Sequence, residues 1–177
     1  MTNKKQIKNE RMKKIFLTIA LLLTFGISYS QYALPKNKLQ LNAGFGFSGW
    51  GIPIYASIDY GIHKDISIGG EISFRSYNEY WYSDYYNRTI IGLLSNCNYH
   101  FNSILNAPNE IDLYAGLNIG FYVWSSAHNY HGNSNSGLGI GAQMGGRYYF
   151  SSKFAGNLEL CLGNSVSGAK IGLTIKL

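Results

Sequence analysis

The sequence has few of the features that identify an enzyme or a disulfide-stabilised secreted domain. It contains only two cysteines, Cys97 and Cys161, in 177 residues. The strand pattern described below directs Cys97 outward and Cys161 inward, a geometry that does not suit a disulfide. We therefore expect no disulfide framework, even in an oxidising compartment. No catalytic or cofactor-binding motif is recognisable, so the sequence predicts neither an enzyme nor a cofactor.

Long apolar runs are also scarce. The one extended apolar segment, Ile15–Ile27, is well short of the roughly 20 residues that a membrane-spanning helix needs. A basic segment precedes it and small residues follow it, which is the order of a signal peptide for Sec export. We predict a signal peptide over residues 1–30, cleavage between Ser30 and Gln31, and one mature domain over residues 31–177. The residue directly after the cleavage point is Gln31 and not a cysteine, so a lipoprotein anchor is not expected.

The net charge of +6 belongs to the predicted signal peptide. Residues 1–30 carry six Lys or Arg against one Glu, which leaves nine basic against eight acidic residues in the mature chain. Because such a nearly neutral domain offers no basic surface, we exclude nucleic acid as a partner. Met12, which two lysines follow, would also begin a complete signal peptide and is an alternative start.

Apolar residues at helical spacing are absent after Gln31, whereas alternation with a period of two residues recurs to the C-terminus. The last strand carries on one face Ala169, Ile171, Leu173, Ile175 and Leu177. The first strand, at residues 38–47, repeats this alternation. We predict six more strands between them, at about residues 52–62, 66–77, 86–101, 111–125, 136–150 and 154–163. The sequence therefore predicts an all-β chain of eight strands.

The predicted connections alternate between short turns and longer loops. Residues 63–65 and 151–153 form tight turns, whereas residues 78–85 and 126–135 form longer loops rich in polar or aromatic side chains. Outer-membrane barrels have short turns on the periplasmic side and longer loops outside. Two connections fit this rule less well, because the proposed outer loop at 48–51 is short and the inner turn at 102–110 is long.

The two strand faces differ in a way that favours a membrane barrel over a soluble one. The apolar face carries no Asp, Glu, Lys or Arg, each of which would be costly in lipid, by about 2–4 kcal/mol for Lys or Arg near the midplane. The polar face is rich in glycine, which weakens a strand unless crowding in a narrow barrel requires it. We therefore predict a closed antiparallel up-and-down transmembrane β-barrel with its polar face inward. Side chains fill the interior of a barrel this size, so a solute channel is disfavoured.

Aromatic residues on the apolar face collect at the two ends of the strands. Those beside the inner turns are Tyr60, Tyr99, Phe101, Tyr148, Phe150 and Phe154. Those toward the opposite rim are Phe45, Phe47, Phe74 and Phe121. Membrane proteins concentrate aromatic residues at the two lipid interfaces, so this placement supports the same orientation of the barrel.

With these patterns in place, the segments YGIHKDISIGGEISF, GGRYYFSSKFAGNLELCLG and GAKIGLTIKL resemble the small eight-stranded outer-membrane proteins of the OmpX and OmpA-barrel type. The resemblance covers roughly residues 32–177 and concerns architecture, not a catalytic motif. It implies a monomer in the outer membrane, with outer-membrane lipid, lipopolysaccharide and the barrel-assembly machinery as partners. Leu177 departs from the family, whose assembly signal usually ends in an aromatic residue.

Charged and ionisable residues on the inward face are predicted to form an interior polar network, since buried charges need partners. They are Asp59, Glu71, Arg75, Arg88, His100, Asp112, Arg147, Glu159, Lys170 and Lys176. Hairpin parity places Arg147 opposite Asn157 and Lys170 opposite Cys161, from which we predict that Glu159 bridges both cations. His100 and Asp112 are predicted to face each other as a structural polar plug, because no nucleophile motif accompanies them.

The outer loops hold the remaining candidates. An aromatic group in the second loop has the composition of a recognition surface or of an interfacial girdle in contact with lipopolysaccharide, and we favour the girdle. It comprises Tyr80, Trp81, Tyr82, Tyr85 and Tyr86. In the third loop, two histidines and two serines could be imagined as a lipid-modifying site, although their spacing is not diagnostic and two histidines do not define a metal site. They are His128, His131, Ser134 and Ser136.

The function predicted from these patterns is that of a non-conducting outer-membrane anchor whose loops serve structure or recognition, with an unidentified surface ligand. A lipid-modifying enzyme and a small porin-like channel are the alternatives.

Overall fold

The computed structural model describes residues 34–81, 84–126, 136–164 and 167–177. The predicted signal peptide, its cleavage site at Ser30 and Gln31, and the alternative start lie outside the described residues and stay predictions. Among the described residues no helix is long and apolar enough to cross a bilayer.

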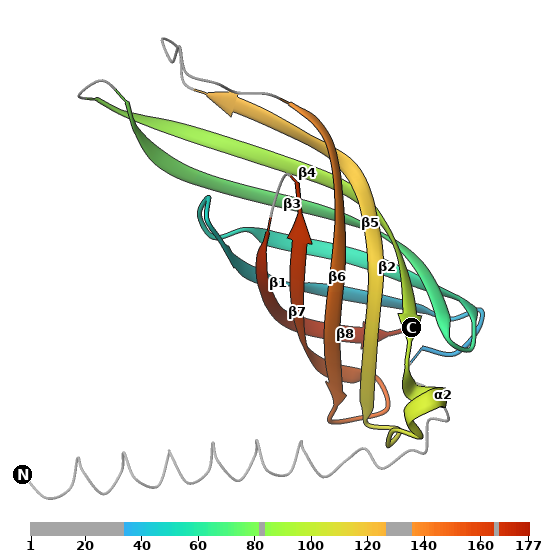
Figure 1. Cartoon of the computed structure of the whole chain (residues 1–177). Helices are drawn as coiled ribbons and strands as arrows, with labels where there is room; N and C mark the ends of the chain where they lie inside the picture. The colour runs from blue at the N-terminus through green and yellow to red at the C-terminus, as the bar shows by residue number, and fades with distance from the viewer. Residues whose placement is uncertain (1–33, 82–83, 127–135, 165–166) are drawn as a thin grey trace, which may run out of the picture.

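Within the described residues, eight antiparallel strands close into a barrel in which each strand pairs with its sequence neighbour and β8 pairs with β1 (Figure 1). A four-residue helix, α2 (Asn102–Leu105), lies between β4 and β5. The strands are β1 (Leu39–Ser48), β2 (Ile54–His63), β3 (Ile66–Trp81), β4 (Asp84–His100), β5 (Ile111–Ser126), β6 (Gly137–Tyr149), β7 (Phe154–Gly163) and β8 (Gly168–Lys176). The predicted all-β, closed, up-and-down barrel of eight strands is confirmed.

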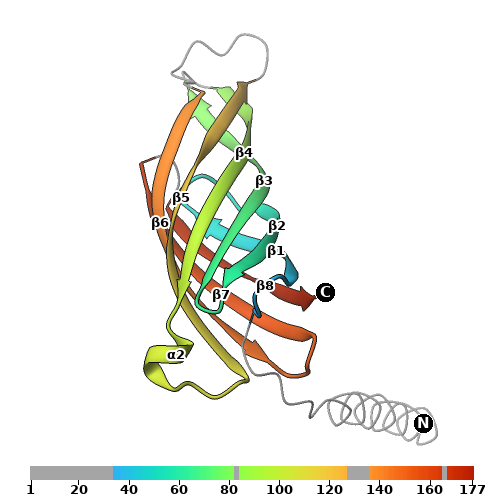
Figure 2. The same cartoon turned by 90° about the vertical axis from the view of Figure 1, so that its right-hand side faces the viewer.

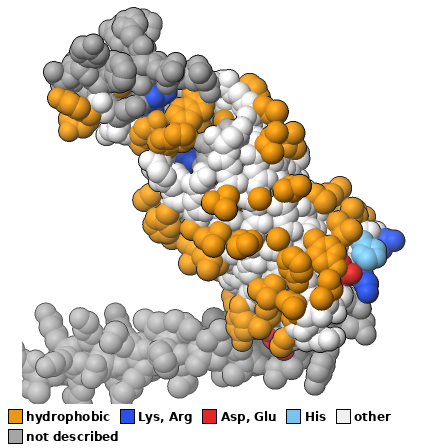
Figure 3. Space-filling model, in the orientation of Figure 1, with side chains coloured by type: hydrophobic (Ala, Val, Ile, Leu, Met, Phe, Trp, Pro, Cys, Tyr) orange, Lys and Arg blue, Asp and Glu red, His pale blue; other side chains and the backbone are white. Residues whose placement is uncertain are grey.

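The alternation of the strands separates a buried polar interior from an exposed apolar exterior. In β1, Gln40 and Asn42 are buried, whereas Leu39 and Leu41 are 37% and 41% exposed. The same alternation on the other strands gives an apolar belt, and Figure 3 shows hydrophobic side chains across the visible middle of the barrel, with charged ones toward its ends. The apolar face therefore points outward to lipid and the polar face points inward, as the sequence predicted, because lipid makes an apolar exterior favourable.

Glycines on the inward face allow the strands to curve closely. A Cβ on Gly44 would lie 2.1 Å from the carbonyl oxygen of Ile171, and one on Gly120 would lie 2.1 Å from that of Leu93. On the outward face, by contrast, a Cβ on Gly156 would meet nothing within 4 Å. Crowding by the backbone of the neighbouring strand is thus the reason why the interior carries glycine.

The wall of the barrel has two heights. Strands β3, β4 and β5 have 16, 17 and 16 residues and β6 has 13, whereas β1, β2 and β7 have 10 and β8 has 9. We call β3–β6 the tall wall and β7, β8, β1 and β2 the low wall. The tall wall extends beyond the low wall at the outer end (Figures 1 and 2). The prediction of a loop at residues 78–85 was wrong. Most of this segment continues the β3–β4 hairpin, in which Tyr80 pairs with Tyr85.

Two connections depart from the expected lengths in ways that the structure explains. The short outer connection after β1 is a tight turn in which the Ser48 hydroxyl donates to the Gly51 carbonyl at 3.0 Å, and Gly51 adopts a positive φ of 84°. The long inner connection is organised by α2, where the Asn102 side chain donates to the Ile111 carbonyl at 2.5 Å and accepts from the Leu113 amide at 3.1 Å. The other inner turns are tight, as predicted.

Candidate functional site

The inner half of the barrel interior is crossed by an ion-paired cluster from four strands, β2, β4, β5 and β6. Arg147 on β6 donates from Nη1 to Asp112 on β5 at 2.8 Å and from Nη2 to Asp59 on β2 at 2.9 Å. His100 Nδ1 lies 2.7 Å from the other oxygen of Asp112. All four side chains are 5% exposed or less. We call these residues the inner cluster.

Neutral side chains complete the bonding of the inner cluster. Gln40 and Asn42 each donate to Asp59 at 3.0 Å, and the Tyr149 hydroxyl donates to Gln40 at 2.9 Å. Lys176 places its Nζ 4.0 Å from the centre of the Tyr149 ring. Because each carboxylate accepts several charge-assisted hydrogen bonds, this end of the barrel is a bonded plug of the kind expected for buried polar groups.

A second cluster lies at the next level outward. Lys170 on β8 donates to both oxygens of Glu71 on β3 at 2.8 and 2.6 Å, and to Glu159 on β7 at 3.1 Å. The Tyr114 hydroxyl donates to Glu159 at 2.8 Å, while its ring lies 4.1 Å below the Arg147 guanidinium carbon. We call Glu71, Glu159 and Lys170 the middle cluster, and Tyr114 links it to the inner cluster.

The prediction that Glu159 bridges Arg147 and Lys170 was half wrong. Arg147 faces Asn157 as expected, but its guanidinium is occupied by Asp59 and Asp112 and makes no ion pair with Glu159. Lys170 faces Glu159 directly, and Cys161 faces Gly168. The β7–β8 pairing is therefore shifted by two residues from the predicted register, toward a tighter outer turn.

Sequence reasoning missed Ser67, which bonds to the predicted His100–Asp112 pair. The Ser67 hydroxyl lies 2.9 Å from His100 Nε2, so the three side chains have the order of a Ser-His-Asp triad. Ser67 is fully buried, however, and Asp112 is also held by Arg147. Both features fit the hydrogen-bonded plug that the sequence predicted. Period-two alternation placed Ser67 on the inward face, but only the β3–β4 register brings it to His100.

The outer part of the interior holds the other two predicted arginines. Arg75 and Arg88 are each 3% exposed. Arg75 donates from Nη1 to the Ser48 hydroxyl at 3.2 Å, and the Arg88 guanidinium carbon lies 5.1 Å from the Trp124 ring centre. Trp124 also meets Trp50 of the first outer turn edge to face, with ring centres 4.9 Å apart.

The predicted aromatic group lies at the tip of the tall wall. The ring centres of Tyr80 and Tyr85 are 5.1 Å apart, and the two residues are 62% and 77% exposed. Tyr86, the next residue in the chain, is half-buried. The backbone of Trp81 ends β3, while Tyr82 lies outside the described residues. The two tyrosines give the outer rim an exposed aromatic surface.

The third outer loop is largely beyond what the structure describes. Of its four candidates, only Ser136 is described, and its hydroxyl accepts a hydrogen bond from the Trp124 amide at 3.0 Å. His128, His131 and Ser134 lie outside the described residues. In the described part of the chain, no group of three His, Cys, Asp or Glu residues could hold a metal ion.

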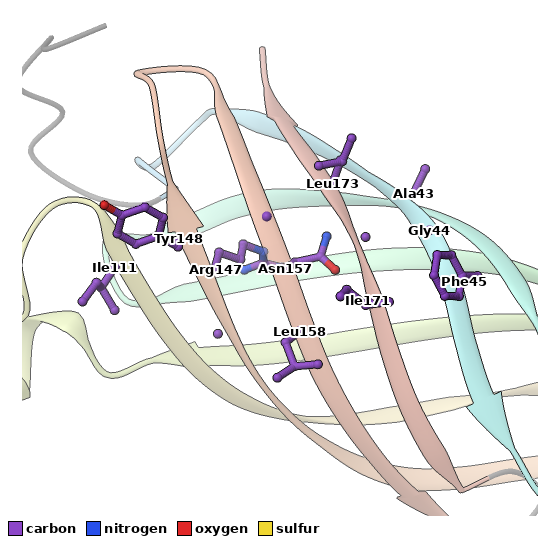
Figure 4. Close-up of a pocket in the computed structure, with 13 residues that line it drawn as sticks. Ala43, Gly44, Phe45, Ile111, Arg147, Tyr148, Asn157, Leu158, Ile171 and Leu173 are labelled. Carbon is purple, nitrogen blue, oxygen red and sulfur yellow. The ribbon is translucent and has the colours of Figure 1, made fainter. Parts of the chain in front are cut away.

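A hollow of about 840 Å³ lies on the outward face of β6, β7, β8 and β1 rather than inside the barrel (Figure 4). Leu158, Ile171 and Leu173 project along it. Gly146 and Gly156 also lie on the outward face, and because they carry no side chains they leave room for the hollow. Its apolar lining belongs to the lipid-facing belt, so acyl chains are its natural contents.

Comparison with known proteins found likeness in structure only. No family model and no curated protein matches this chain. The outer-membrane protein OprG from Pseudomonas aeruginosa superposes with a TM-score of 0.63 at 10% identity, over 83% of this chain and 99% of that one. Neisserial surface protein A gives 0.55 at 12% identity, over 79% and 95%, and Ail of Yersinia pestis in a phospholipid nanodisc gives 0.53 at 10% identity, over 80% and 100%. The chain therefore has the fold of the small eight-stranded outer-membrane β-barrel proteins.

Proposed function

We propose that this protein is an integral outer-membrane barrel that acts as a closed, non-conducting anchor and presents its tall wall at the cell surface for structure or recognition. The observation that carries the proposal is the crossing of the lumen by two ion-paired clusters. Asp59 and Arg147 come from opposite parts of the wall, as do Glu71 and Lys170, yet each pair is in direct contact.

Closure follows from the energy of those contacts. A solute that passed through the lumen would have to separate buried ions, and breaking a buried pair costs about 3–5 kcal/mol. The inner and middle clusters lie in series and Tyr114 joins them, so a path through one still meets the other. A continuous aqueous pore is therefore disfavoured.

The location and partners belong to the same proposal. The exposed apolar belt matches outer-membrane lipid and lipopolysaccharide as neighbours. We propose the barrel-assembly machinery as the partner in insertion. We propose a monomer, because the barrel is closed over the height of its low wall and leaves no unpaired sheet edge there to recruit a second copy. The exposed Tyr80 and Tyr85 suit the interfacial girdle that the sequence favours, and they also suit a recognition surface, since tyrosine supplies rigid contact area. Among similar barrels, Ail has a structure with the heparin analogue sucrose octasulfate, at a TM-score of 0.51 and 10% identity.

Planar-bilayer recording of the refolded protein tests closure. We expect no steady conductance above that of a bilayer treated with the heat-denatured protein. Ohmic channels of defined size would contradict the anchor and support the porin-like alternative. Density fractionation of envelopes tests location, and recovery with the inner membrane would contradict the proposal.

An enzyme acting on lipid is the second candidate, favoured only by the order of Ser67, His100 and Asp112. A fluorophosphonate probe, which labels activated serines, tests it on the folded protein in lipid. We expect no labelling, because Ser67 is buried. Labelling that disappears in Ser67→Ala would establish a hydrolase, and a lipid product lost in His131→Ala would instead implicate the third outer loop.

A further inference from the structure

Arg75 is a buried cation without a carboxylate partner among the residues that the structure describes. It is 3% exposed, and its one hydrogen bond there is from Nη1 to the neutral Ser48 hydroxyl. Its Nε is buried without any hydrogen-bond acceptor. Because a buried ion without a direct counter-ion is costly, a carboxylate in contact with Arg75 would be favourable.

A comparison with Arg147 shows what is missing. The Nε of Arg147 also lacks an acceptor, but both of its Nη atoms donate to carboxylates. The carboxylate nearest to Arg75 along its own strand is Glu71, and Lys170 binds both oxygens of Glu71. Glu71 is thus committed to the middle cluster and makes no ion pair with Arg75.

A small cavity lies beside Arg75, on the outer side of the middle cluster. Its volume is about 30 Å³, and its lining includes the ion-paired Glu71 and Lys170 as well as Arg75, Ser73, Asn118 and Tyr122. Since one water molecule needs about 10–15 Å³ of such space, the cavity holds a group of only two or three heavy atoms. Ser48 and Pro53, at the ends of the first outer turn, form part of its rim.

We propose that this cavity is a binding site for a carboxylate group that enters from the outer mouth of the barrel. The carboxylate would accept a hydrogen bond from the guanidinium group of Arg75 and supply the direct counter-ion that Arg75 lacks. Lys170 and Glu71 also border the cavity, and their opposite charges offset each other there. A planar carboxylate matches the side of a guanidinium and is small enough for the cavity, whereas a tetrahedral phosphate or sulfate is larger. The group is carried by a free carboxylic acid or by a sugar acid of lipopolysaccharide. This proposal goes beyond the anchor function and does not depend on it.

Nitrogen-15 NMR of the refolded protein in phosphatidylcholine nanodiscs tests the site, with the Nε–H signal of Arg75 as the reporter and formate as the probe. At constant ionic strength, formate is expected to shift this signal saturably, and chloride at the same concentration is not. Arg75→Lys is expected to weaken formate binding about tenfold, because lysine offers a point charge in place of a fork. Lys153→Gln, on an exposed inner turn, is the matched control and should bind formate as the native protein does.

Nanodiscs that contain lipopolysaccharide distinguish the two sources. If the signal is already shifted there and formate has no further effect, the group comes from lipopolysaccharide. If the signal moves only when formate is added, the ligand is a free acid. If it moves in neither case, the proposal is overturned and Arg75 only balances the net negative charge of the middle cluster. A loss of stability in Arg75→Gln that is equal in formate and in chloride would lead to the same conclusion, and the titration of the native protein stands even if this variant does not fold.

Discussion

Arg147 and Arg75 are equally buried, yet they lie in opposite halves of the barrel with different surroundings. Arg147, at the inner end, is held by two carboxylates and lies over an aromatic ring. Arg75, toward the outer mouth, donates to a single neutral hydroxyl and borders a cavity. The difference teaches that the inner half of the interior pairs its buried cation with its own carboxylates, as a structural plug requires, whereas the outer half keeps the proposed carboxylate site.

The largest expected effect is the loss of the inner cation. Arg147→Met would leave Asp59 and Asp112 buried without their cation and is expected to cost about 3–5 kcal/mol of unfolding free energy. Arg75→Met separates no ion pair and should cost clearly less. Urea unfolding in lipid vesicles measures both. Equal losses in the two variants would break the contrast between the halves.

A lysine on the outward face tests where the lipid ends. Leu173 is 62% exposed in the belt, and Leu173→Lys is expected to cost about 2–4 kcal/mol if it lies near the bilayer midplane. Tyr85→Lys introduces the same charge at the tip of the tall wall and should cost about 0–1 kcal/mol there. The folded, heat-modifiable band on gels reports each. A folded Leu173→Lys variant that is soluble without detergent would refute the membrane barrel.

Removal of the Ser67 hydroxyl should have a smaller effect. Ser67→Ala breaks one buried hydrogen bond to His100 and is expected to cost about 1 kcal/mol. The same urea series measures it, with Ser76→Ala as a control because the Ser76 hydroxyl donates to Asn87 at an exposed position. A Ser67→Ala variant as stable as the native protein would show that the plug does not rely on this bond.

The smallest effect on stability is expected at the outer rim. Tyr80→Ala and Tyr85→Ala remove exposed rings and should change the unfolding free energy by less than about 0.5 kcal/mol. Retention of purified lipopolysaccharide by the protein is the second measurement. Reduced retention at unchanged stability would support contact of these rings with lipopolysaccharide, as a girdle requires, and unchanged retention would favour recognition of another ligand.

Local pattern was enough to predict the barrel but not the contacts inside it. Alternation in segments such as 169–177 marks both faces, because successive strand residues point to opposite sides whatever their partners are. Asp112 and Arg147 lie opposite each other on the neighbouring strands β5 and β6. The sequence did not predict this pair, because a long loop between two strands does not fix their register. Asp59 comes from β2 and reaches Arg147 across the lumen, and no hairpin rule could find that contact.

The sequence by itself determined the fold class, the number of strands and the face that meets lipid, since these depend on residue periodicity and on the cost of charge in hydrocarbon. Only the tertiary structure decided which ions pair, that Ser67 joins His100 and Asp112, and that Arg75 borders a cavity. Closure of the barrel fixes the registers of all eight strand pairs together, and a shift of two residues in one pair keeps the faces but exchanges every neighbour across it.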